Sequence, residues 1–209
     1  MESIASVRAA PSWRDEALMS MPCWDRDRRP TRVRAMLARQ AHDRRREPAP
    51  RTDVSEYDRH FWEQRWSQAL REHGARVAQR PPNAHLTAEI RDLRPGRALD
   101  AGCGHGSDAL WLATRGWQVT AVDFAATALA HARSTAEAMG PDVAERIDWV
   151  EADLATWTPQ QDTYDLVACL YVHVAGSVEE MVQRMATGVA RGGTLFLVGQ
   201  RPSTRRPEP

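Results

Sequence analysis

A glycine-rich loop with acidic residues on both sides is the part of the sequence best suited to chemistry. Residues 102–106 read Gly-Cys-Gly-His-Gly. Glycines at alternate positions let the backbone turn sharply and let a ligand approach it with no Cβ in between. Asp100 stands two residues before the first glycine, and Asp123 ends the next apolar segment. Such a loop can hold a nucleotide-type cofactor, with the carboxylate of Asp123 accepting hydrogen bonds from both ribose hydroxyls.

The spacing within this loop argues against a dinucleotide. The dinucleotide fingerprint Gly-x-Gly-x-x-Gly needs a glycine where this chain has Ser107. The carboxylate of Asp100 would also repel a nearby pyrophosphate, whereas it suits a ligand that carries a sulfonium and an α-ammonium group. A nicotinamide-dependent dehydrogenase is therefore the weakest of the enzyme hypotheses.

The elements that must position these residues alternate regularly after residue 96. Strands alternating with helices predict an α/β fold, a three-layer, doubly wound, Rossmann-like and mostly parallel sheet. Ligands in such sheets bind at the carboxyl ends of the strands. We expect strands at 97–101, 118–122, 147–151, 164–170 and 194–198, and helices at 107–115, 125–139 and 177–190.

Two helices are expected before this core. Residues 55–73 place aromatic side chains at spacings near three and four, which predicts an amphipathic helix that Ser55 can cap. A second helix is expected at 84–93, after the sequence Arg-Pro-Pro-Asn.

The charge distribution separates a basic leader from an acidic body. The chain has 28 Lys+Arg and 28 Asp+Glu residues, and all of the bases are arginine. The absence of lysine excludes lysine Schiff-base chemistry and a Walker-type phosphate loop. Residues 1–51 hold 12 Arg and 7 acidic residues, and we expect them to be a disordered extension, although a helix at 31–46 is compatible with the spacing. The alternatives are an arm that binds nucleic acid and a start codon near Met36.

The domain prediction is therefore a leader at 1–51, capping helices at 52–96, a core at 97–200 and a disordered tail at 201–209. Three scattered cysteines favour a reducing compartment and no metal site. No apolar run approaches the length of a membrane span, so we expect a cytoplasmic protein.

Four segments in this order resemble the class I S-adenosylmethionine-dependent methyltransferases: ALDAGCGHGSDALWLATRGWQVTAVD, WVEADL, YDLVACLYVHV and ARGGTLFLVG. The resemblance implies the class I methyltransferase fold, S-adenosyl-L-methionine as cofactor, and methyl transfer by in-line displacement. The first expected helix and the residues after it look like the N-terminal segment of small-molecule methyltransferases of the tellurite-resistance and thiopurine types. By this resemblance the cofactor-binding residues are Tyr57, Trp62, Arg65, Asp100, Gly102, Cys103, Gly104, Gly106, Asp123, Phe124, Asp153, Leu154 and Cys169.

The residues after the fourth core strand bear on the acceptor. Members of the family that methylate DNA bases or glutamine carry an Asn/Asp-Pro-Pro-Tyr/Phe loop there, and this chain does not. We therefore expect a small-molecule O, S or N acceptor. Tyr171 and His173 are the candidate catalytic residues. For His173, a role as a base and a structural role are equally good interpretations. An RNA methyltransferase that uses the basic leader, and a catalytically silent module that binds the cofactor or a partner, remain alternatives.

The family pattern normally continues after the fifth strand with a helix and two further strands. This chain has no room for them, so the resemblance predicts a C-terminally truncated sheet. Residues 195–198 would then form an exposed edge, at which a second copy or a partner chain could pair.

Overall fold

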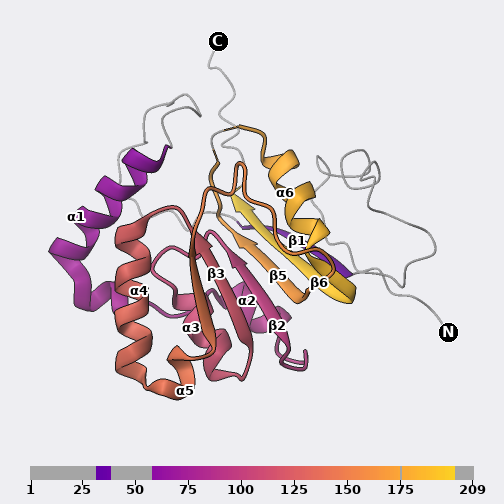
Figure 1. Ribbon diagram of the computed structural model, residues 1–209, viewed down its shortest axis with the longest axis horizontal. Coiled ribbons are helices and arrows are strands. Elements are labelled where there is room, and N and C mark those ends of the chain that lie inside the picture. The colour runs from indigo at the N-terminus through magenta and orange to yellow at the C-terminus, as the bar shows by residue number, and fades with distance from the viewer. Residues whose placement is uncertain (1–31, 39–57, 175, 201–209) are drawn as a thin grey trace, which may run out of the picture.

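The computed structural model describes residues 32–38, 58–174 and 176–200. They form a six-stranded sheet in the order β1-β6-β5-β2-β3-β4, and every pair of neighbouring strands is parallel. Figure 1 shows this sheet with its helices. The predicted α/β architecture with a doubly wound parallel sheet is confirmed. The strands are β1 (Arg32–Ala38), β2 (Arg97–Ala101), β3 (Gln118–Asp123), β4 (Ile147–Glu151), β5 (Tyr164–Leu170) and β6 (Val189–Gln200).

Six helices accompany the sheet in the described part of the chain: α1 (Arg59–Ala78), α2 (Ala84–Glu89), α3 (Ser107–Thr114), α4 (Ala126–Met139), α5 (Pro141–Ala144) and α6 (Val178–Thr187). Among these helices, none is long and apolar enough to cross a membrane.

Alternate residues along each central strand pack on opposite faces of the sheet. In β2, Ala98 belongs to a core cluster with residues of α2, α3, α4 and α5, whereas Leu99 belongs to a second cluster with Met181 and Met185 of α6. Strands buried on both faces read as continuous apolar runs, and the limits of β2 and β5, which are buried in this way, agree with the sequence prediction, as do those of the edge strand β4. The helices thus form one layer on each side of the sheet.

The last helix and strand differ from their predicted limits. We expected a helix to residue 190 and a strand from 194, whereas α6 ends at Thr187 and β6 begins at Val189. Gly188 separates them, and a Cβ there would lie 2.8 Å from Pro159 Cγ. The close approach of Pro159 therefore favours glycine at this position.

Strand β1 overturns two predictions about the leader. Residues 32–38 are neither a helix nor part of a disordered extension, because they pair in parallel with β6, with Ala35 opposite Leu197. The edge of β6 that was expected to be exposed is therefore occupied, and the proposed dimer or partner contact at that edge loses its basis. A strand in this position satisfies the backbone groups that β6 would otherwise leave unpaired. The remainder of the leader lies outside the described residues.

Helix α1 begins later than the aromatic spacing suggested. Its N-cap is Asp58, whose carboxylate accepts a hydrogen bond of 2.8 Å from the backbone N–H of Phe61, whereas Ser55 lies outside the described residues. The helix is kinked at His73, whose φ of −143° and ψ of 28° are not helical. The buried residue of α1 is Val77, beyond the kink. The segment before the kink therefore lies on the protein without entering either core cluster, and it contacts α4 (Figure 1).

Candidate cofactor and acceptor site

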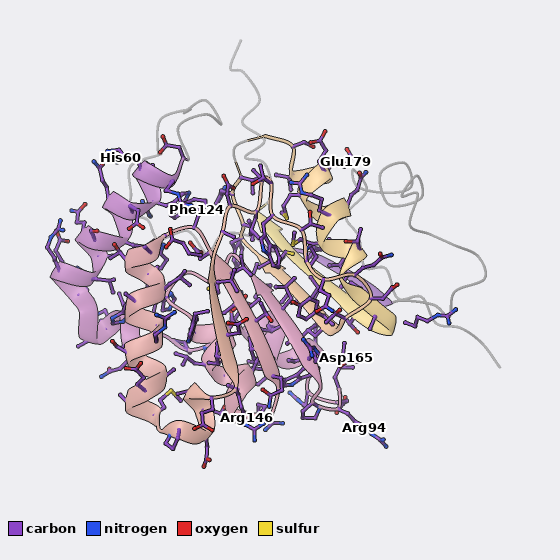
Figure 2. The ribbon with its side chains drawn as sticks, viewed as in Figure 1. His60, Arg94, Phe124, Arg146, Asp165 and Glu179 are labelled. Atoms are coloured by element: carbon purple, nitrogen blue, oxygen red, sulfur yellow. The ribbon has the colours of Figure 1, made fainter. Side chains whose placement is uncertain are left out.

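A pocket of about 320 Å³ opens at the carboxyl ends of β2, β3 and β5. Figure 2 shows Phe124, which lines the pocket, near the carboxyl ends of the strands, and Arg94, Arg146 and Asp165 near their opposite, amino ends. Its volume lies within the range of small-molecule sites, about 300–1,000 Å³. The pocket therefore occupies the position at which doubly wound sheets bind ligands.

The glycine loop forms the floor of this pocket. Gly102, Gly104 and Gly106 have φ values of 79°, 53° and 81°, a region that residues with a Cβ rarely adopt. The N–H groups of Gly102 and Cys103 donate to the carbonyl of Val122, at 2.8 and 3.1 Å. These bonds fasten the loop to the end of β3, and Gly102, Cys103 and Gly104 line the pocket.

Asp123 connects the loop to the start of α4. Its Oδ2 accepts a hydrogen bond of 2.8 Å from Gly104 N–H, and its Oδ1 accepts one of 2.9 Å from Ala125 N–H. Burial raises the pKa of this carboxyl, and the backbone hydrogen bonds oppose that rise. Each oxygen keeps a further lone pair. The carboxylate is thus held in one orientation and can still accept two hydroxyl donors from a ligand.

Two further carboxyl groups lie beneath the loop. Asp100 is only 2% exposed, and its Oδ2 has no hydrogen-bond partner among the residues that the structure describes. Burial raises its pKa well above the usual value, and the charges of Asp108 and Asp123 raise it further. Asp108 lines the pocket and accepts a hydrogen bond of 2.6 Å from Asn83 N–H. The floor therefore favours a ligand with positive charge.

The tryptophans of α1 form the wall opposite the floor. Trp62 and Trp66 both line the pocket. Trp66 packs on the loop so closely that a Cβ on Gly104 would lie 2.8 Å from its ring. At the start of α1, Arg59 Nη1 donates to the carbonyl of Phe124 at 2.8 Å and to Glu151 at 2.6 Å. Polar contacts thus hold the first turns of α1 over the ends of β3 and β4.

The segment after β5 forms the third wall. Tyr171 has a φ of 55°, unusual for a residue other than glycine, and its N–H donates to the carbonyl of Val198 at 2.7 Å. His173 stacks on Trp62 with 5.9 Å between ring centroids. Burial lowers the pKa of His173, and the charge of Arg65 lowers it further. The imidazole is therefore mostly neutral at pH 7.

The sequence-predicted residues fall into three groups. Tyr57 lies outside the described residues. Arg65, Asp100, Gly106, Asp153 and Cys169 do not line the pocket: the carboxylate of Asp153, for example, is exposed and accepts a hydrogen bond of 2.8 Å from Ala155 N–H. The pocket does bring together Trp62, Gly102, Cys103, Gly104, Asp123, Phe124, Leu154, Tyr171 and His173.

Several lining residues were not predicted to bind the cofactor. Trp66 belongs to the aromatic face of the expected helix, and its position four residues after Trp62 is the signal that could have placed it. Asp108 and Asn83 lie at the starts of α3 and α2. Arg80 precedes two prolines and carries no signal of its own in the sequence. All four line the pocket.

Residues 98–193 match the family described as "Methyltransferase domain". Trans-aconitate 2-methyltransferase of Streptomyces avermitilis is 34% identical over 154 residues, which are 70% of this chain and 49% of that protein. Ubiquinone biosynthesis O-methyltransferase of Xanthomonas euvesicatoria pv. vesicatoria is 33% identical over 122 residues, 57% of this chain and 49% of that protein. The chain thus spans about half the length of these relatives.

Among solved structures, the fold is similar to that of an S-adenosyl-L-methionine-dependent methyltransferase described as putative, from Methanococcus maripaludis. The TM-score is 0.50 at 15% identity, covering 74% of this chain and 68% of the other. At this identity the likeness concerns the fold alone.

Proposed function

We propose that the chain, whose residues 98–193 match the family described as "Methyltransferase domain", is a class I methyltransferase that binds S-adenosylmethionine and transfers its methyl group to a small-molecule acceptor. The observation that carries this proposal is the carboxylate of Asp123, fixed by the N–H groups of Gly104 and Ala125 at the edge of the pocket. A carboxylate fixed in this way suits the two ribose hydroxyls. The names of two relatives, which specify trans-aconitate and ubiquinone biosynthesis, support a small organic acceptor.

The residues present fit this cofactor. Gly102, Cys103 and Gly104 of the loop line the pocket, the floor carries carboxyl groups that favour cationic groups, and Phe124 and Leu154 offer apolar surface. S-adenosylmethionine, when bound, supplies a methyl group on a positively charged sulfur. The chain's part is to hold donor and acceptor in line and to exclude water, which can contribute roughly 7–11 kcal/mol. Trp62, Trp66 and the segment 170–174 enclose the space for the acceptor.

The proposal is tested by calorimetry and by a transfer screen. We expect S-adenosylhomocysteine to bind with a dissociation constant in the micromolar range. Purified protein with radiolabelled S-adenosylmethionine should label at least one member of a panel of thiols, phenols, carboxylates and amines, with bulk RNA as a separate arm. Binding without transfer to any acceptor would indicate a silent module, labelling of RNA alone would favour the RNA hypothesis, and no binding would reject the function altogether.

His173 is the proposed general base when the acceptor is a hydroxyl group. A base must be neutral to accept a proton, and the pKa of His173 is lowered from its ordinary value. The rate should therefore be constant near pH 7 and fall as the pH drops through a midpoint below 6.5. The variant His173→Gln should no longer show this acidic limb of the pH–rate profile, and its kcat should fall by about 100-fold.

Two controls separate this role from a structural one. Arg65→Gln removes a positive charge that lowers the pKa of His173, so the midpoint should move to higher pH. An acceptor that is already an anion needs no base and should be methylated equally well by wild type and His173→Gln. If the rate of His173→Gln still falls at low pH, the group that titrates there is not His173.

A further inference from the structure

Arg80 stands at a fixed place beside the glycine loop. It follows α1, and its N–H donates to the carbonyl of Val77 at 3.1 Å. Pro81 and Pro82 come next, and proline restricts the backbone on both sides. The N–H of Asn83 is anchored on Asp108 at 2.6 Å. The backbone around Arg80 is thus held at both ends, and its side chain lines the pocket together with Gly104 and His105.

The guanidinium of Arg80 is a cation available to a ligand. Of the arginines that the structure describes, Arg80 is the one that lines the pocket. It forms no hydrogen bond or ion pair through its side chain with any other described residue. Its charge contributes, after burial, to lowering the pKa of His105 to about 4. His105 is therefore neutral at pH 7 and does not compete with Arg80 for an anion.

The other charges of the pocket have the opposite sign. Asp108 and Asp123 line it, and the buried Asp100 lies close enough to interact with both. The amino-acid end of the proposed cofactor carries an ammonium and a carboxylate. Near the acidic floor the ammonium is attracted and the carboxylate is repelled. The carboxylate should accordingly turn toward the cationic side of the pocket.

We propose that Arg80 binds the carboxylate of the cofactor's amino-acid end. The proposal rests on the proposed function, since it presupposes that S-adenosylmethionine occupies the pocket. Arg65, which the family resemblance placed among the cofactor-binding residues, is the other arginine to consider for this role. Both arginines are exposed, but Arg65 lies 5.8 Å from the ring centroid of Trp62 and does not line the pocket, whereas Arg80 does.

The test compares two ligands that differ in the amino-acid end. S-adenosylhomocysteine carries the carboxylate, whereas 5′-methylthioadenosine lacks the whole amino-acid portion. Both are titrated by calorimetry, at low salt because screening weakens exposed charge pairs, into wild type, Arg80→Gln and Arg65→Gln. Arg80→Gln should weaken the binding of S-adenosylhomocysteine by about 10- to 100-fold, as expected for the loss of a hydrogen bond between charged groups. It should change the affinity for 5′-methylthioadenosine by less than about twofold.

Arg65→Gln is the matched control, because it removes the same charge from the neighbouring α1 surface outside the pocket lining. It should leave both affinities within about twofold of wild type. The proposal is overturned if Arg80→Gln binds S-adenosylhomocysteine as wild type does, if both ligands lose affinity equally, or if Arg65→Gln shows the loss instead. Wild-type protein that binds neither ligand contradicts the proposed function itself, an outcome distinct from these three.

Discussion

Replacing Asp123 by alanine should weaken the binding of S-adenosylhomocysteine by at least about 100-fold. The carboxylate is held by Gly104 N–H and Ala125 N–H, so it can receive two ribose hydroxyls without first being ordered. Each hydrogen bond to a charged group contributes about 1.5–3 kcal/mol, and alanine removes both. The loss should appear in calorimetric dissociation constants for the cofactor product.

Two controls accompany this variant. Asp123→Asn keeps one acceptor oxygen, so its affinity for S-adenosylhomocysteine should fall by only about tenfold. Asp148→Ala removes an exposed carboxylate from β4 and should bind like wild type. The melting temperature of each unliganded variant must also be measured, because alanine at 123 leaves two N–H groups without their partner. Wild-type affinity in a folded Asp123→Ala protein would mean that the ribose is not bound at Asp123.

Replacing Gly106 by alanine should give the largest loss of stability of any single methyl group added to the loop. A Cβ there would lie 2.8 Å from Ala132 Cβ on α4 and 2.7 Å from the ring of Trp149. The positive φ of 81° costs roughly 1–2 kcal/mol for a residue with a Cβ. Overpacking of this kind costs about 1–3 kcal/mol more. The melting temperature should fall by on the order of 10 °C.

Gly116→Ala separates the two causes. Gly116 has a similar φ of 89°, but a Cβ there would meet Pro95 only at ordinary contact distances of 3.7 and 3.8 Å. The free energy of unfolding of this variant should fall only by the cost of the backbone conformation, roughly 1–2 kcal/mol. If the two variants unfold at the same denaturant concentration, the packing of α4 against the loop is looser than the distances imply.

The parts of the fold that depend on short stretches of chain were predictable. The runs Arg97–Ala101 and Tyr164–Leu170 are buried on both faces, and such runs stand out in a sequence as continuous apolar segments. Asp123 and the glycine loop were predictable for the same reason, because a strand end, a turn and a helix start are adjacent along the chain. What these residues bind follows from local chemistry.

Features that depend on contacts between segments far apart in the sequence could not be predicted from the local sequence pattern. Whether residues 32–38 become a helix or a strand depends on whether β6 offers an edge, and the local pattern does not contain that information. The choice between Arg65 and Arg80 depends on the rotation of α1. Residues in a helix turn by about 100° per position, so Arg65 is displaced around α1 from Trp66 and lies over the ring of Trp62 without lining the pocket. Arg80 reaches the pocket because the chain turns back after the helix.

The pairing of β1 with β6 also sets the order in which the chain can be assembled. Chains are synthesised from the N-terminus, and domains begin to fold as they emerge. Residues 32–38 leave the ribosome before any other described strand, yet their partner at 189–200 is among the last described segments to appear. Closing such a long loop is slow relative to local contacts. The glycine loop and Asp123 can therefore form before β1 joins the sheet, and we expect β1 to be the last of the described strands to be incorporated.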